Sequence, residues 1–92
     1  MPKNDAEMML KVNIDALAER VSQNKKWGVQ RHSMAEWLSI LVEEVGEVAQ
    51  AINRLNFPSD AKETDADNLY KELIQVAAVA SAIAEQVKER GY

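Results

Sequence analysis

Residues 33–55 read SMAEWLSILVEEVGEVAQAINRL and carry both a helix start signal and a long apolar repeat. Ser33, followed three residues later by Glu36, matches a capping box, in which each side chain accepts a hydrogen bond from the backbone N–H of the other residue. A helix is therefore predicted to begin at Met34 and to stop at residues 56–58, because Pro58 disfavours helical geometry in the residue before it. Its apolar side chains alternate at three- and four-residue spacing, which predicts one buried stripe: Leu38, Leu41, Val45, Val48, Ile52 and Leu55.

Two further helices are predicted, at about residues 5–23 and about residues 67–89. Gly91 follows the last helix as a typical C-terminal stop. The polar, acidic stretch 59–67 is predicted to connect the last two helices and to begin with a helical turn capped by Asp60. Apolar residues of the two outer helices keep the same spacing and predict buried stripes: Leu10, Ile14, Leu17 and Val21 in the first, and Leu69, Leu73, Val76, Ala80, Ile83 and Val87 in the last.

The predicted fold class is all-α, an antiparallel bundle of three main helices in a single domain over residues 1–92. Only Ser81 is polar between Val76 and Ala84, so this part of the last helix should be covered on more than one side. A domain this small buries a modest part of its apolar surface. We therefore expect a homo-oligomer, either dimer or tetramer, in which a second chain completes a four-helix-type core.

Composition sets limits on the class of protein. Apolar residues make up 47% of the chain and charged residues 28%, which is typical of a soluble globular protein, and cysteine is absent. The chain start lacks the apolar run of a signal peptide, and the longest apolar-rich stretch is too short to cross a bilayer, so a cytoplasmic location without a membrane partner is expected. The net charge of −4 and the lack of a basic stripe argue against duplex nucleic acid as a partner.

Acidic side chains flank the apolar stripes of the last two helices. Glu44 lies beside the stripe of the second helix and Glu72 beside that of the third, and each is followed three residues later by a polar side chain, Glu47 or Gln75. Antiparallel packing can bring these two edges face to face. Two unit charges about 4 Å apart repel by roughly 4 kcal/mol at an effective dielectric of about 20, so converging glutamates need a proton or a cation.

The ligand chemistry narrows the metal. Oxygen ligands without cysteine or a suitable histidine favour a hard ion, Mg²⁺ or alternatively Mn²⁺. Neither cluster has the Glu-x-x-His spacing of di-iron bundles, so that class is set aside. Glutamates are also common on solvated helix faces, and spacing alone leaves a metal site and a solvated face equally open. Glu43 could assist the site or be solvated.

The run LVEEVGEVAQAI at residues 41–52 resembles the first metal motif of the MazG-like, all-α nucleoside triphosphate pyrophosphohydrolases. That family pairs E-x-x-E with a later E-x-x-D; Glu44 and Glu47 match the first motif, and Glu72 matches the start of the second. Gln75 stands where the family has aspartate. Residues 26–32 and 72–80 also resemble a small single-domain branch of the superfamily, so the resemblance covers most of the chain from Trp27 to Val87.

The resemblance implies hydrolysis of a nucleoside triphosphate, canonical or noncanonical, to a monophosphate and pyrophosphate, as in nucleotide-pool house-cleaning. It implies Mg²⁺ held by Glu44, Glu47 and Glu72, with Gln75 as an uncharged ligand, and with Glu44 or Glu43 activating water.

Substrate contacts are expected near the start of the second helix. Trp27 or Trp37 could stack on a base, and Lys26, Arg31 or His32 could meet phosphate. Such residues are more often packing, solvated or locally hydrogen-bonding residues, and that alternative stays open for each. Gln75 keeps an alternative function open, a non-catalytic helical oligomer of the same descent that binds nucleotides or another protein. A purely structural helical dimer would leave the flanking glutamates unexplained.

Overall fold

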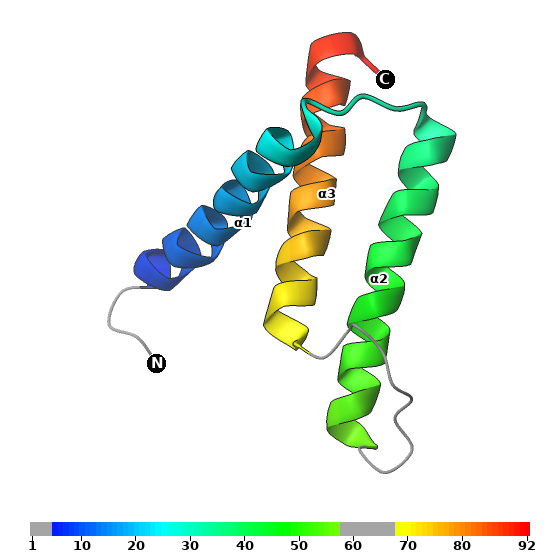
Figure 1. Cartoon of the computed structure of the whole chain (residues 1–92). Coiled ribbons are helices and arrows are strands. Elements are labelled where there is room, and N and C mark those ends of the chain that lie inside the picture. The colour runs from blue at the N-terminus through cyan, green and yellow to red at the C-terminus, as the bar shows by residue number, and fades with distance from the viewer. Residues whose placement is uncertain (1–4, 58–67) are drawn as a thin grey trace.

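Three helices make up the part of the chain that the computed structural model describes, residues 5–57 and 68–92 (Figure 1). They are α1, Asp5–Trp27; α2, Met34–Asn56; and α3, Leu69–Arg90. α3 lies between the other two and packs against both, whereas within the described residues the backbones of α1 and α2 do not approach each other closely (Figure 1). The prediction of an all-α domain with three main helices is confirmed. None of the helices in this part of the chain is long and apolar enough to cross a membrane.

The direction of the helices differs in part from the predicted antiparallel bundle. α2 runs antiparallel to α3, while α1 crosses α3 at an angle and runs toward the same end of the molecule (Figure 1). The last turns of α1 and the first turns of α2 therefore reach the C-terminal half of α3. A short connection, residues 28–33, joins α1 to α2 across this end of α3.

Helix ends follow the local sequence. The capping box at the start of α2 is present: Ser33 Oγ accepts a hydrogen bond from the Glu36 N–H at 3.2 Å, and Glu36 Oε1 accepts one from the Ser33 N–H at 3.1 Å. α1 continues to Trp27, four residues beyond its predicted end, and Gly28 then takes a φ of 76° that favours glycine. The predicted turn capped by Asp60, the connection 59–67 and the predicted start of the last helix at 67 lie outside the described residues.

The core of the single chain lies between α2 and α3. Trp37 and Ala51 are buried on α2, and Ile74, Ala78 and Val79 are buried on α3. α1 and α2 contact α3 from two sides, as predicted, although Ala80 and Ala84 of the apolar stretch 76–84 remain exposed (Figure 1). Both covering helices belong to the same chain, so this feature alone does not require a second copy.

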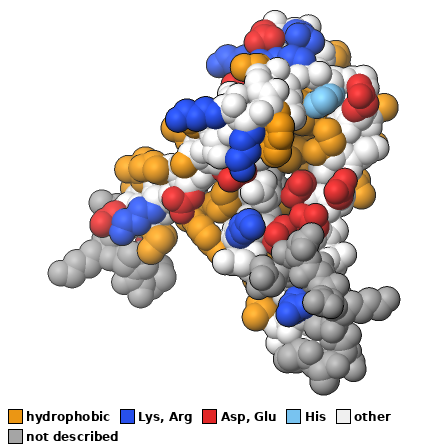
Figure 2. Space-filling model, viewed as in Figure 1, with side chains coloured by type: hydrophobic (Ala, Val, Ile, Leu, Met, Phe, Trp, Pro, Cys, Tyr) orange, Lys and Arg blue, Asp and Glu red, His pale blue; other side chains and the backbone are white. Residues whose placement is uncertain are grey.

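The predicted buried stripe of α1 is wrong for the single chain. Its members, which we call the α1 stripe, are between 47% and 63% exposed: Leu10, Ile14, Leu17 and Val21. The reason is that α1 meets α3 through its opposite, polar side. The Tyr70 hydroxyl donates a hydrogen bond to Asp15, and Arg20 donates to Ser81 at 2.9 Å. No residue of α1 is buried, and apolar side chains are exposed along it beside charged ones (Figure 2).

The stripes of α2 and α3 are also only partly covered. The side of α2 that meets α3 carries Trp37, Glu44 and Ala51, which lie seven residues apart and so on one line of the helix. The predicted stripe is turned away from this line and is half-buried or exposed. Exposed members are Leu38, Val45, Ile52 and Leu55 on α2, and Leu73, Ala80 and Val87 on α3.

Candidate active site

Three glutamates converge where α2 and α3 pack together. Glu44 and Glu47 come from the middle of α2 and Glu72 from the first turn of α3. One carboxylate oxygen of each lies within 4.8 Å of one oxygen of the other two. Glu72 is only 4% exposed, whereas Glu44 and Glu47 are half-buried. Acidic side chains gather over α2 and α3 on the face shown in Figure 2.

The electrostatics of this cluster are most evident at Glu44. Burial, together with the nearby charges of Glu47 and Glu72, raises the pKa of the Glu44 carboxyl to about 7. Glu44 Oε2 is buried and has no hydrogen-bond partner within the described residues. A buried oxygen of this kind is costly unless a proton or cation satisfies it.

The donor set fits a hard divalent ion. All the converging atoms are carboxylate oxygens, which Mg²⁺ and Mn²⁺ prefer. A dication would replace the proton that Glu44 holds near neutral pH and would offset the repulsion among the three charges. Glu43 is exposed and lies outside this cluster, although its charge contributes to the raised pKa of Glu44.

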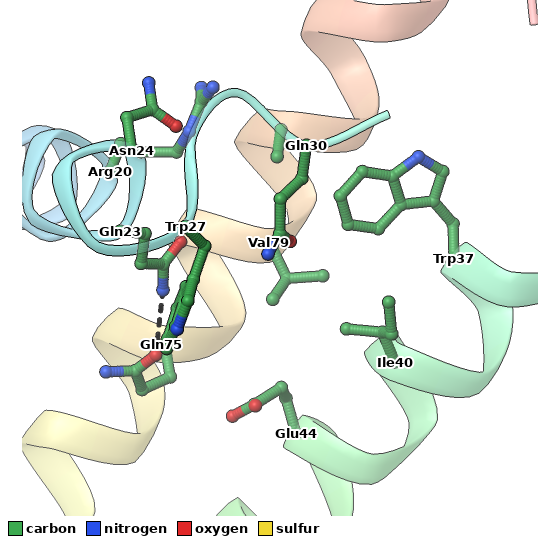
Figure 3. Close-up of a pocket in the computed structure, with 11 residues that line it drawn as sticks. Arg20, Gln23, Asn24, Trp27, Gln30, Trp37, Ile40, Glu44, Gln75 and Val79 are labelled. Carbon is green, nitrogen blue, oxygen red and sulfur yellow. Dashed lines mark hydrogen bonds between the residues drawn. The ribbon is translucent and has the colours of Figure 1, made fainter. Parts of the chain in front are cut away.

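A cavity of about 130 Å³ opens beside Glu44, with walls from all three helices and from the connection 28–33 (Figure 3). Figure 3 shows Trp27 and Gln75 on one side of it and Trp37 and Glu44 on the other. Its polar lining consists mainly of carboxamides. The lining residues are Arg20, Gln23, Asn24, Trp27, Gln30, Trp37, Ile40, Glu44, Gln75, Val79 and Ala82.

Of the side chains predicted to contact substrate, the two tryptophans line this cavity. Trp37 is 3% exposed, and its indole N–H donates a hydrogen bond to Gln86. Trp27 is 63% exposed, so most of its surface remains open to solvent. Gln75 also lines the cavity, and its Oε1 accepts a hydrogen bond from Gln23.

The predicted phosphate contacts lie outside the cavity lining. The Arg31 guanidinium donates to Glu85 and Glu89 of α3, and these hydrogen bonds raise the pKa of Arg31. The His32 ring packs edge-on against Trp37, with 4.7 Å between ring centroids. Lys26 is exposed, and its ammonium group lies 5.8 Å from the centroid of a Trp27 ring.

Comparison with known families finds a match to the MazG nucleotide pyrophosphohydrolase domain over residues 32–92. The chain belongs to the MazG family. No curated protein and no solved structure matches it. The matched region of this MazG domain contains all three converging glutamates and Gln75 but leaves out α1. Five residues that line the cavity therefore lie outside the matched region: Arg20, Gln23, Asn24 and Trp27 on α1, and Gln30 in the connection.

Sequence reasoning missed several residues that line the cavity or support its walls. Arg20, Gln23 and Asn24 look like ordinary solvated residues near the end of a helix, and only the packing of α1 on α3 reveals their position. Gln86 had a detectable signal. It continues a line along α3 with Gln75, Val79 and Ala82, at spacings of four, three and four residues. A polar residue that extends such a line is a candidate for a buried hydrogen-bonding role.

Proposed function

We propose that this MazG-family chain is a Mg²⁺-dependent nucleoside triphosphate pyrophosphohydrolase. It would convert a nucleoside triphosphate, canonical or noncanonical, to a nucleoside monophosphate and pyrophosphate. The observation that supports this most strongly is the partly buried cluster of Glu44, Glu47 and Glu72, of which Glu44 also lines a cavity with indoles and carboxamides. The family match supports the reaction class.

The three glutamates would hold the divalent ion. When bound, the ion would contact phosphate oxygens and offset the charge that develops in the transition state. Glu44 or Glu43 would orient the attacking water and accept its proton as the water oxygen bonds to phosphorus. The bridging oxygen between the α- and β-phosphates leaves with pyrophosphate. Glu47 and Glu72 would act as ligands, and Gln75 remains a predicted uncharged ligand.

The cavity would receive the base. Trp27 and Trp37 offer aromatic surfaces from two sides, and carboxamides can both donate and accept hydrogen bonds. The cationic side chain in the lining, Arg20, is already bonded to Ser81 and Glu85. Such a cavity suits an uncharged ring better than a phosphate. The phosphates would then extend toward Glu44 and the metal.

The predicted phosphate contacts take a lesser role in this proposal. Arg31 would have to give up Glu85 and Glu89 to reach a phosphate, so we propose that it anchors the connection 28–33 to α3. Lys26 and His32 remain predicted phosphate contacts. The divalent ion would balance most of the phosphate charge.

We also propose that the protein is a homo-oligomer, dimer or tetramer. The side chains of the α1 stripe are exposed to solvent in the single chain, yet their spacing is typical of a helix face that is buried. Leu38, Val45 and Ile52 form a second exposed line on α2 with heptad spacing. A second copy of the chain could cover both.

Pyrophosphate release from a panel of canonical and modified triphosphates, with and without Mg²⁺, tests the enzymatic proposal. Turnover should require the metal and should be lost in Glu44→Gln and Glu72→Gln. Gln75 favours the second candidate, a module that binds nucleotides or another protein without turnover. The non-catalytic function would be favoured if the pure protein cleaves no triphosphate and Glu44→Gln leaves nucleotide binding unchanged.

A further inference from the structure

Gln86 of α3 is the largest fully buried side chain of the described residues, at 2% exposure. Its Oε1 accepts hydrogen bonds from the Trp37 indole N–H at 2.8 Å and from the His32 backbone N–H at 3.1 Å. Its Nε2 donates to the His32 carbonyl oxygen at 2.7 Å. One carboxamide therefore binds both backbone groups of His32 and the indole of Trp37.

These contacts fix two features of the cavity. His32 directly precedes the N-cap of α2, so Gln86 attaches the start of α2 to α3. The bond to the Trp37 nitrogen also determines how the indole is turned: the nitrogen points away from Glu44, and the rest of the ring forms the cavity wall (Figure 3). The His32 ring packs against the same indole at nearly a right angle.

Attachment of the connection 28–33 does not depend on Gln86 alone. Arg31 binds Glu85 and Glu89, and Arg20 binds Glu85 and Ser81, so charged contacts already tie this region to α3. What Gln86 adds is a hydrogen-bond acceptor for a buried indole. Without it, the Trp37 N–H would be buried without a partner or the ring would turn, since an unsatisfied buried donor is costly.

We propose that Gln86 is a positioning residue that holds Trp37 as a wall of the base-binding cavity and so sets nucleotide affinity. The proposal rests on the proposed function for its nucleotide part. A carboxamide is required because the group must accept from two donors and donate to one carbonyl. Leucine can do neither. A carboxylate can accept from both donors, but it has no hydrogen to donate to the His32 carbonyl oxygen.

The first test follows the indole directly. In ¹⁵N-labelled protein, the Trp37 indole N–H, assigned with Trp27→Phe, should exchange slowly with solvent in the wild type. In Gln86→Leu its resonance should shift and exchange faster. Unchanged shift and exchange would overturn the positioning role, whatever the protein does with nucleotides.

The second test uses Gln86→Glu, which has nearly the same shape and can be rescued by protonation. A protonated carboxyl group donates to the His32 carbonyl, so this variant should recover as the pH falls from about 8 to about 5.5, a range set by burial of the introduced acid. The measurement is the ratio of variant KM to wild-type KM at each pH, which cancels the pH dependence that the two proteins share. For Gln86→Leu we expect the KM ratio to be about tenfold at every pH, the size of effect that the loss of one hydrogen bond to a cavity-wall residue would have. For Gln86→Glu we expect the KM ratio to fall toward one as the pH is lowered.

The control is Ile74→Ala, which removes a buried side chain of the α2–α3 core that does not line the cavity. It should lower the melting temperature and leave KM unchanged. If Ile74→Ala raises KM as much as Gln86→Leu does, or if the Gln86→Glu ratio is flat with pH, Gln86 acts only on stability. If wild-type protein neither binds nor cleaves any triphosphate, the proposed function fails, while the indole measurement still decides whether Gln86 positions Trp37.

Discussion

Gln75 accepts a hydrogen bond from Gln23, with 3.2 Å between Gln75 Oε1 and Gln23 Nε2, and this contact joins α3 to α1 beside the cavity. Gln23 also donates to Glu19 at 2.9 Å. The resemblance to the family pattern places aspartate, a charged ligand, at position 75. In this chain the position instead carries a neutral amide that bridges two helices, so three carboxylates converge rather than four.

Replacing Gln75 with aspartate should therefore strengthen metal binding while it weakens the contact with α1. Aspartate is one methylene shorter and cannot keep the bond to Gln23, but it adds a negative charge one helical turn from Glu72. We expect Mn²⁺ affinity, measured by titration calorimetry, to rise at least about tenfold, since a full charge placed near a dication changes its energy by more than ~1.4 kcal/mol. Asn13→Asp adds the same charge on α1 away from the cluster and should have little effect. An affinity that does not rise would place residue 75 away from the ion.

Removing the charge of Glu44 should have opposite effects on the metal-free and the metal-bound protein. In the metal-free protein, Glu44→Gln relieves repulsion within the cluster and should raise the free energy of unfolding by about 1–2 kcal/mol at pH 8. Mg²⁺ should stabilise the wild type but not the variant. Thermal unfolding with and without Mg²⁺ measures both effects. Glu43→Gln is the matched control, because Glu43 is exposed and should change stability by less than about 0.5 kcal/mol. Destabilisation of the metal-free protein by Glu44→Gln would argue against a strained cluster.

The raised pKa of Glu44 also predicts how pH acts. With a pKa of about 7 when folded and a lower value when unfolded, the folded protein holds more protons between these values. The contribution of Glu44 to stability of the metal-free protein should therefore decline as pH rises toward 7 and level off above it. Metal binding must displace that proton, so Mn²⁺ affinity should rise by up to about tenfold per pH unit below 7 and then reach a plateau. Calorimetry from acidic to alkaline pH measures the slope, and a Glu44→Gln variant with the same slope would contradict the assignment to Glu44.

Local signals along the chain were sufficient to predict the helices. The capping box at Ser33 and the helix end near Phe57 depend on residues close together in the sequence, so they can be predicted without knowledge of the fold. The predicted end of the first helix, at residue 23, is four residues earlier than the end of α1 at Trp27. The residues that follow Gln23 are polar, so the apolar repeat gives no signal that the helix continues. The acidic motif was found for the same reason as the caps, since its spacing is fixed within each helix.

Helix faces were harder to assign than helix limits. Periodicity shows that Leu17 and Val21 share a face, but it does not say which segment covers that face. In the single chain α3 packs against the polar side of α1, where it contacts Asp15, Arg20 and Gln23. The cavity could not be predicted for the same reason. It depends on residues from three helices and a connection whose relative positions are set by tertiary contacts alone.

Arg31 provides a test between a structural and a substrate-binding role. Because its guanidinium already binds Glu85 and Glu89, Arg31→Ala should lower the melting temperature, and Glu89→Ala should add little to that loss in the double variant. The ratio of affinities for a nucleoside triphosphate and its monophosphate should stay within about twofold of the wild-type ratio, because partly exposed ion pairs contribute little beyond their own site. A selective loss of triphosphate affinity would instead assign Arg31 to the phosphates. Lys26→Ala, measured in the same way, tests the other predicted cation.

The α1 stripe allows a direct test of assembly. Leu17 is 63% exposed in the single chain, so Leu17→Lys should change the stability of a monomer by less than about 0.5 kcal/mol. If a second copy covers the stripe, the same substitution buries a charge at the interface, and the oligomer should dissociate. Sedimentation and light scattering over a range of protein concentrations measure this. Val29→Lys is the matched control, since Val29 is 64% exposed but lies in the connection between α1 and α2. A monomeric wild type, or an equal effect of both substitutions, would mean that no second copy binds there and that the apolar spacing of α1 has another cause.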